Sequence, residues 1–187
     1  MAQTEQGSYT IFSDRSYSQV NTYASFDGSM FYVNEALIGS VGGTVGLTIN
    51  HAFSIGPTGA YIFESTNEPV LIIPPGYHNY VIKKYFWYLG MMMESTLFPR
   101  APLHITIPMM IGGGQRSYHI QETNEMWNYY AQSLSCENFF ITSVGARLEI
   151  NIADGFRFSI GPSYKYATNL TFLTGFSLDM SIKIGSF

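Results

Sequence analysis

The chain has 187 residues, which suits one domain with a short additional segment. Only 12% of the residues are charged, whereas 16% are aromatic and 18 are glycine, a combination typical of a membrane barrel and unusual for a soluble enzyme. The net charge of −4, without any basic run, excludes nucleic acid as an expected partner, and no segment reaches the roughly 18 apolar residues of a membrane-spanning helix.

The first 19 residues are polar and rich in turn-forming side chains, so residues 1–19 are expected to form a leader segment, with an extra strand conceivable near Tyr9–Phe12. They lack the basic and apolar regions of a signal peptide. We therefore expect the sequence to begin at or near a mature terminus. The barrel domain described below is expected over residues 20–187.

The clearest pattern covers residues 37–63. Apolar residues alternate with Gly, Ser and Thr over 37–49, a corner follows at Asn50-His51, and the alternation resumes over 53–63. A period of two predicts two long strands that pair as a hairpin. A first strand is expected before them, at about Val20–Val33.

Further alternating segments predict the remaining strands, at 84–98, 103–114, 139–152, 156–166 and 176–184. Tight turns are expected at Pro99–Pro102 and Asp154-Gly155, and long loops at 64–83 and 115–138. Pro108 indicates a bulge or an irregular ladder, because proline cannot donate a backbone hydrogen bond.

The length of these strands bears on the environment. About 11 to 14 residues is longer than the usual strand and is what a tilted strand needs to cross a bilayer. One apolar face and one face of small polar residues suit a barrel with lipid outside and a crowded interior. The sequence therefore predicts an all-β fold: a closed, antiparallel, up-and-down transmembrane β-barrel of about eight strands.

Aromatic residues provide an independent test of this topology. If the tight turns are periplasmic, the aromatic residues gather in two bands, one at each membrane interface. The band beside the long loops comprises Tyr61, Phe63, Tyr85, Trp87, Phe140, Tyr164 and Tyr166, and the band beside the tight turns comprises Phe53, Phe98 and Phe156.

Charged residues at inward positions are the main candidates for function. They are Glu94, His104, Arg147, Glu149, Arg157, Lys165, Asp179 and Lys183. Because the interior of an eight-stranded barrel is only wide enough for side chains, these groups must pair with each other or with trapped water. A salt-bridge network that plugs the barrel is the favoured interpretation, with a gated polar path for protons or small ions as the alternative. Glu94, Arg147 and Glu149 are the expected mutual partners.

Other motifs carry little chemistry. The four histidines are dispersed without metal-ligand spacing, and Gly112–Gly114 lacks the strand-to-helix context of a phosphate loop. Cys136 is the single cysteine and is interpreted as a loop thiol. The sequence predicts no catalytic residue, no metal and no cofactor.

Four parts of the sequence carry a resemblance to a known family: GGTVGLTINHAFSIGPTGAYIF, YLGMMMESTLFP with LHITIPMMIGGG, FFITSVGARLEINIADGFRFSIGPSYKY, and FSLDMSIKIGSF. They resemble the small outer-membrane β-barrel proteins of Bacteroidetes, which are similar to OmpA/OmpX-type barrels. The resemblance covers roughly residues 37–187 except the long loops. It implies a location in the bacterial outer membrane, in contact with lipid and lipopolysaccharide. It also implies assembly by the barrel-assembly machinery, for which Phe187 looks like the carboxy-terminal signal, although Phe187 is out of phase with Ile182 and Ile184.

The leading hypothesis is a plugged, non-enzymatic outer-membrane barrel with a structural or binding role. It would act through its extracellular loops, where a protein partner could bind, or through a companion complex. The alternatives are a lipid-modifying enzyme, a narrow pore, and a soluble lipocalin-like barrel, which would require the apolar faces to point inward.

Overall fold

The computed structural model describes residues 19–33, 36–64, 80–122, 131–170 and 173–186. The strands in chain order are β1 (Val20–Val33), β2 (Ala36–Ile49), β3 (Phe53–Glu64), β4 (Tyr80–Leu97), β5 (Leu103–Glu122), β6 (Ala131–Gly145), β7 (Arg147–Ala153), β8 (Phe156–Ala167) and β9 (Gly175–Gly185). The predicted first strand, Val20–Val33, is confirmed. The leader and its possible strand at Tyr9–Phe12 lie outside the described residues, except Gln19.

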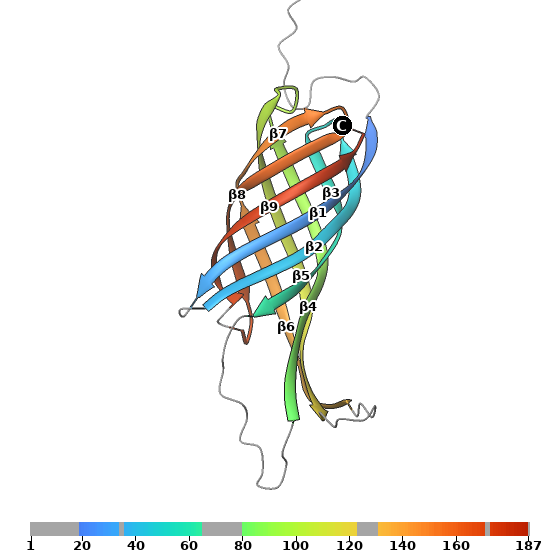
Figure 1. Cartoon of the computed structure of the whole chain (residues 1–187). Helices are drawn as coiled ribbons and strands as arrows, with labels where there is room; N and C mark the ends of the chain where they lie inside the picture. Colours follow the sequence, from blue (N-terminus) through green and yellow to red (C-terminus); the bar gives the residue numbers. More distant parts are fainter. Residues whose placement is uncertain (1–18, 34–35, 65–79, 123–130, 171–172, 187) are drawn as a thin grey trace, which may run out of the picture.

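The strands close into a barrel. Apart from β6 and β7, strands that are consecutive in the chain pair antiparallel, and β1 pairs with β9 to complete the ring (Figure 1). β6 and β7 together make one barrel strand, since both pair with β5 and β8 in an unchanged register. The predicted closed, antiparallel, eight-stranded barrel is therefore confirmed.

The break between β6 and β7 at Ala146 has a local cause. Two prolines, Pro108 on β5 and Pro162 on β8, flank this point on the adjacent strands, and neither has a backbone N–H to donate. Ala146 N still donates to Pro162 O, at 3.0 Å. The irregularity predicted at Pro108 is thus a gap in the ladder rather than a shift of register.

The register fixes the tilt of the strands. We follow Cα partners from strand to strand once around the barrel, starting at Ile105 on β5 and passing through Leu148, Met180 and Tyr61. The path returns to β5 at Gln115, so the stagger of the strands is ten residues. With a rise of about 3.3 Å per residue and a strand spacing of about 4.8 Å, this stagger gives a tilt of about 40°. An eight-stranded barrel of this kind has an interior just wide enough to be filled by side chains.

Three tight turns share one end of the barrel, here called the turn end. Asn50 and His51 have φ of 52° and 58°, and Gly155 has φ of 77°, where glycine avoids the steric cost of a side chain. In the turn after β4, Ala101 N donates to Phe98 O at 2.9 Å. The opposite end, where β3 and β5 finish, is called the loop end.

The alternation predicted from the sequence decides which side chains face out. Exposed large apolar residues occur on every strand, whereas the buried set includes many charged and hydroxyl side chains. The barrel is inside out relative to a soluble protein, and its apolar surface forms a continuous belt. The lipocalin alternative required the reverse arrangement and is therefore wrong.

At the loop end, β4, β5 and β6 continue beyond the rim of the barrel (Figure 1). The β3–β4 pairing ends at Ile62–Phe86, whereas the β4–β5 pairing runs on to Tyr80–Glu122. The loops predicted at 64–83 and 115–138 were therefore too long: residues 80–83, 115–122 and 131–138 are strand. Beyond the rim there is no interior to line, so the inside-outside alternation that marks a barrel strand is lost.

Candidate functional site

The two sides of the inner wall differ in side-chain size. Inward positions on β2 and β3 carry only Gly, Ala, Ser and Thr between Ser40 and Thr48 and between Ser54 and Ala60. At Gly46 an added Cβ would lie 2.4 Å from Ile55 O and 2.9 Å from Cε1 of Tyr23, so the strand backbone and the Tyr23 ring together leave room only for glycine. Long charged side chains from β7, β8 and β9 occupy the space that these small residues leave.

One group of ionic residues lies near the turn end. This turn-end cluster consists of Glu94, His104, Glu149, Arg157 and Lys183. Glu149 has no exposed surface, and its carboxylate contacts His104 Nε2 at 2.8 Å, Arg157 Nη1 at 3.2 Å and Lys183 Nζ at 2.5 Å. Lys183 also pairs with Glu94 across the barrel.

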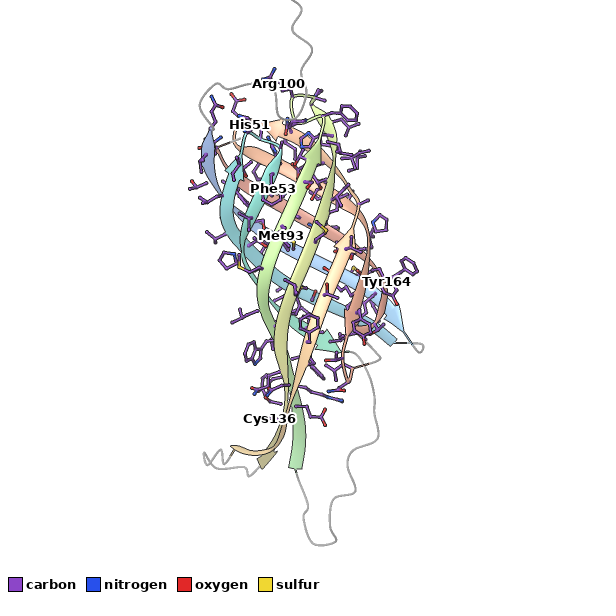
Figure 2. All side chains as sticks on the ribbon, turned by 180° about the vertical axis from the view of Figure 1, so that it is seen from behind. His51, Phe53, Met93, Arg100, Cys136 and Tyr164 are labelled. Carbon is purple, nitrogen blue, oxygen red and sulfur yellow. The ribbon has the colours of Figure 1, made fainter. Side chains whose placement is uncertain are left out.

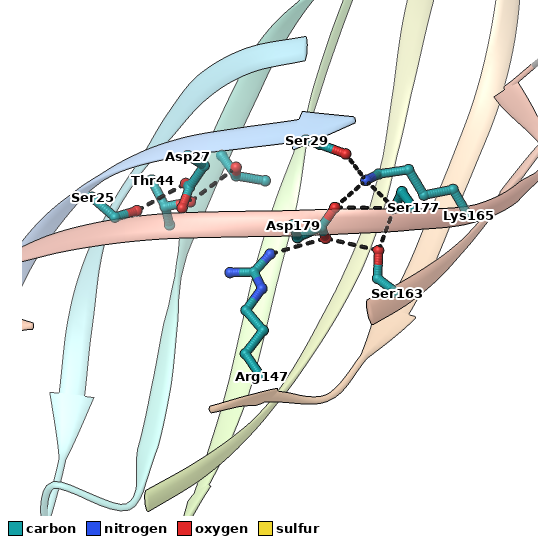
Figure 3. A network of polar contacts seen from close by, with 10 residues as sticks. Ser25, Asp27, Ser29, Thr44, Arg147, Ser163, Lys165, Ser177 and Asp179 are labelled. Atoms are coloured by element: carbon teal, nitrogen blue, oxygen red, sulfur yellow. Dashed lines mark hydrogen bonds and ion pairs between the residues drawn. The ribbon is translucent and has the colours of Figure 1, made fainter. Parts of the chain in front are cut away.

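A second group, the central cluster, is built around Asp179 (Figure 3). Asp179 accepts hydrogen bonds from Arg147 Nη2 at 3.1 Å, Lys165 Nζ at 2.7 Å, Ser163 Oγ at 2.7 Å and Ser177 Oγ at 3.0 Å. Lys165 also donates to Ser29 Oγ and Ser177 Oγ. A carboxylate with four donors is satisfied even though it is buried.

All eight predicted inward charges are buried in the interior, but their partners differ from those expected. Glu94, Arg147 and Glu149 do not form one group, because Arg147 pairs with Asp179. The side chain of Arg147 reaches Asp179 past Gly161, which is the Cα partner of Asp179 on β8 and lies against the backbone of Arg147. The expected mutual pairing of these three residues was therefore wrong.

Asp27 is an interior carboxylate that the sequence reasoning missed. Its Oδ2 accepts hydrogen bonds from Ser25 Oγ at 2.9 Å and Thr44 Oγ1 at 3.0 Å. It lines the same small cavity as Arg147 and Lys165. β1 alternates poorly by composition, and its inward face, which carries Asp27, becomes evident only when the strand is aligned in register with β2.

The interior charges balance within each region. Glu94 and Glu149 face Arg157 and Lys183 at the turn end, with His104 beside them. In the centre, Asp27 and Asp179 offset Arg147 and Lys165. Such balance is what allows ionic groups to remain in a narrow interior, since an unpaired buried charge is strongly destabilising.

The loop-end part of the interior is apolar, whereas the sequence predicted small polar residues and charges on the inner face. Its buried residues, here called the loop-end apolar layer, are Phe31, Ile38, Ile62, Phe86, Met110, Phe139, Ile141, Ala167, Leu170 and Leu173. The signal was present in the sequence: on β1, β2, β3, β4 and β6 the inward positions change from small or polar to large apolar residues toward the loop end. Gly114 makes room for this layer, since an added Cβ would lie 2.4 Å from Cζ of Phe139.

The connection between β8 and β9 completes the layer. Leu170 and Leu173 are only 2% and 1% exposed. Thr168 ties this connection to β6, because its N donates to Phe140 O and its Oγ1 accepts from Phe140 N, both at 2.9 Å. Ala167 N donates to Thr174 Oγ1 at 3.0 Å, which closes the base of the connection.

The predicted aromatic residues lie on the outer surface, near the two ends of the barrel. Phe53 and Tyr164 mark these two ends in Figure 2. At the loop end, Tyr61 packs edge-to-face on Phe63 and Tyr85, with ring centroids 5.2 and 6.5 Å apart. The remaining members of the predicted bands, all at least partly exposed, are Trp87, Phe140, Tyr166, Phe98 and Phe156.

The described residues contain no cluster with the geometry of a metal centre. No group of three or more His, Cys, Asp or Glu side chains with metal-binding geometry occurs there. No helix in the described part of the chain is long and apolar enough to cross a membrane.

At the turn end, partial burial lowers the pKa of His51, and the positive charges of Arg157 and Arg100 lower it further. Phe187, the predicted assembly signal, lies outside the described residues.

Comparison with known proteins identifies the fold. No protein-family model and no curated protein sequence matches the chain. Among solved structures, the N-terminal β-barrel domain of Pseudomonas aeruginosa OprF is similar, with a TM-score of 0.53 and 9% identity over 90% of this chain and 99% of that one. Neisserial surface protein A gives a TM-score of 0.51 and 9% identity, over 89% of this chain and 94% of that one. A major outer membrane protein from Thermus thermophilus also gives 0.51 and 9%, over 88% and 98%.

The chain thus has the fold of bacterial outer-membrane β-barrel proteins. At these identities the likeness concerns the fold, and the resemblance to Bacteroidetes proteins stays a prediction.

Proposed function

We propose that the chain is an integral protein of the bacterial outer membrane with a closed interior and no enzymatic activity. Its role is structural or binding, exerted through the loop end, either directly or within a companion complex. The observation that carries this proposal is the exposed apolar belt on every strand around a filled, charge-balanced interior. Only a lipid environment stabilises that arrangement in a folded protein.

The orientation follows from the asymmetry of the two ends. Short periplasmic turns and longer outer connections are the rule for outer-membrane barrels. The turn end therefore faces the periplasm, and the loop end, with its strand extension, faces the outside. The exposed aromatic residues then lie at the two membrane interfaces, where aromatic side chains are favoured and where lipid and lipopolysaccharide would surround the barrel.

The interior supports a plugged barrel over a pore. The turn-end cluster, the central cluster and the loop-end apolar layer follow one another along the barrel axis, and each consists of buried side chains. The cavity between them, lined by Asp27, Tyr88 and Arg147 among others, has a volume of about 30 Å³. That volume suits one or two water molecules rather than a continuous channel.

The strand extension supports a binding role. The β6–β8 pairing ends at Ile141–Ala167, although β6 begins at Ala131, so one edge of β6 extends past its partner. β4 likewise continues beyond its pairing with β3. Such edges present backbone donors and acceptors to which an extended segment of a partner protein can pair.

Gel mobility tests the location and closure. The refolded protein in detergent is compared boiled and unboiled, because a lipid-facing barrel resists the gel detergent until it is heated. A heat-dependent shift is expected. A protein that folds in plain buffer and shows no shift would contradict the membrane location.

The exposed thiol of Cys136 on β6 tests the orientation and the binding role (Figure 2). On intact cells, a membrane-impermeant maleimide should label Cys136, whereas Asp154→Cys in a Cys136→Ser background, at the turn end, should stay unlabelled. A photoreactive maleimide at Cys136 should give a discrete crosslinked partner that the Asp154→Cys control does not give. Equal labelling at both positions contradicts the orientation, and a Cys136 probe without adducts contradicts the binding role.

A further inference from the structure

The loop-end apolar layer differs from the rest of the interior in a way that bears on permeability. We propose that this layer, completed by Leu170 and Leu173, is the dry barrier to water and ions, whereas the two ionic clusters hold the barrel together without sealing it. The inference rests on the proposed function as a closed membrane-spanning barrel. It places the barrier that closes the barrel interior at the loop-end apolar layer.

The layer surrounds the barrel axis. β1, β2, β3, β4, β5, β6 and β8 each contribute a buried apolar residue to it. β9 does not, because its two inward residues nearest the loop end are Gly175 and Ser177. The connection that leads into β9 supplies Leu170 and Leu173 instead, so the leucines fill the one sector that the strands leave polar.

The connection is held in that position by six described hydrogen bonds. Three join Thr168 to Phe140 on β6, two join Ala167 to Thr174, and Leu173 N donates to Leu170 O at 3.0 Å. Asn169 takes a positive φ of 62°, a conformation that asparagine tolerates better than most residues and that reverses the chain here. The leucines are thus fixed in the mouth by the backbone around them.

Immediately beneath the layer the interior becomes polar. Lys165 Nζ lies 5.9 Å from the ring centroid of Phe31 and binds Ser29, Ser177 and Asp179 on its other side. The small cavity begins here, lined by Ser40, Arg147 and Asp179. Arg147 Nε, Ser159 Oγ and Ser181 Oγ are buried and lack a protein partner, which is the chemistry that holds internal water.

The ionic clusters are poor barriers for the same reason that they are stable. Glu149 contacts three cationic or potentially cationic groups, and Asp179 accepts from two cations and two hydroxyls, so water can replace one contact while others persist. An apolar constriction has no such substitutes and blocks ions by dewetting. The barrier to permeation therefore lies at the apolar layer.

The test compares conductance in planar lipid bilayers for four proteins: wild type, Glu94→Gln, Leu170→Ala/Leu173→Ala and Leu170→Ser/Leu173→Ser. Alanine and serine remove nearly the same volume, but an apolar void stays dry whereas hydroxyls admit water. Wild type, Glu94→Gln and the alanine variant are expected to remain at the level of bare lipid. The serine variant should raise the ion leak at least tenfold.

Three results would overturn the proposal. Conductance of Glu94→Gln would place the barrier in the ionic network, and a folded serine variant without conductance would remove the layer's role. Equal conductance of the alanine and serine variants would make the leucines a steric plug rather than a dry barrier. Each protein is first checked by its heat-dependent gel shift, and Leu173→Ser replaces a double variant that does not fold.

A second measurement needs no change in the layer. Ser40→Cys in a Cys136→Ser background places a nearly isosteric thiol beneath Ile38, and silver ion serves as a small cationic probe. Modification from the outer side should be at least tenfold slower than for Asn169→Cys, which is exposed above the layer. Equal rates would contradict the barrier. Both rates are measured on the protein in intact outer membranes, where silver ion reaches the barrel from the outer side. A wild type that fails to insert into lipid would instead contradict the proposed function.

Discussion

The two ends of the barrel interior solve the same packing problem with different chemistry. At the turn end, Glu149 and Lys183 fill the space left by small residues on β2 and β3, and every charge has a partner. At the loop end, Phe31, Phe86 and Leu173 fill a similar cross-section with apolar side chains. The cations of Lys165 and Arg116 lie against the rings of Phe31 and Phe86. The difference shows that strand alternation determines which side chains face inward but leaves the chemistry of the interior open.

The difference also predicts how each end fails. An ionic cluster depends on all of its members, because the loss of one leaves others unpaired. An apolar layer loses only the contacts of the residue removed and the energy of the void. Mutations should therefore be more costly at the turn end than at the loop end.

The largest effect is expected for Glu149→Gln. This variant removes the charge that faces His104, Arg157 and Lys183, and we expect the free energy of unfolding in detergent or lipid to fall by about 3–5 kcal/mol. Urea titration of the folded fraction on unboiled gels measures it. Glu137→Gln, an exposed carboxylate on the β6 extension, is the control and should change stability by less than about 0.5 kcal/mol. A loss below about 1 kcal/mol at Glu149 would contradict the shared-acceptor geometry.

Leu173→Ala is expected to rank second. It removes a fully buried side chain from the apolar layer and should lower the free energy of unfolding by about 2–4 kcal/mol. Leu178→Ala is the matched control on the lipid-facing side of β9 and should cost about 1 kcal/mol or less, since no cavity forms. The same urea titration applies, and equal losses at the two positions would mean that Leu173 is not packed in the interior.

A smaller effect is expected for Thr168→Val. The change keeps the side-chain shape and removes the hydroxyl that accepts from Phe140 N, at a cost of about 1 kcal/mol. Amide hydrogen exchange of Phe140 should rise selectively, because its acceptor is lost. Unchanged exchange at Phe140 would contradict the tether between the β8–β9 connection and β6.

The smallest effect is expected for Ser181→Ala. The Ser181 hydroxyl is buried without a protein partner, so its removal should change stability by about 0.5 kcal/mol or less. Ser163→Ala removes a hydrogen bond to Asp179 and should cost about 1–3 kcal/mol. If the two serines proved equally costly, the assignment of partners around Asp179 would be wrong.

Much of the fold follows from the sequence because a membrane barrel repeats one rule along every strand. Strict alternation predicted β2 and β3 and the inward direction of Arg147, Glu149 and Lys183. The Asp-Gly pair predicted the turn at Asp154-Gly155. Strand length indicated a lipid environment. The bounds of β1 also agreed, although the faces of that strand were not evident from its composition.

The interior was less predictable because its contacts depend on the stagger of the strands. The register decides that Arg147 meets Asp179 past Gly161, and no pattern within one strand carries that information. The inward positions of Phe86, Phe139 and Ile141 were readable from alternation. The burial of Leu170 and Leu173 was not, because a connection outside the strands has no such alternation.

The most direct test of the central claim is whether the face that carries Trp87 meets lipid. The chain has two tryptophans, and Trp127→Phe leaves Trp87, on β4, as the single tryptophan, whose fluorescence is excited selectively. In liposomes with brominated acyl chains, strong quenching of Trp87 and weak quenching by aqueous acrylamide are predicted. Quenching by acrylamide without quenching by the brominated lipid would contradict the lipid-facing barrel.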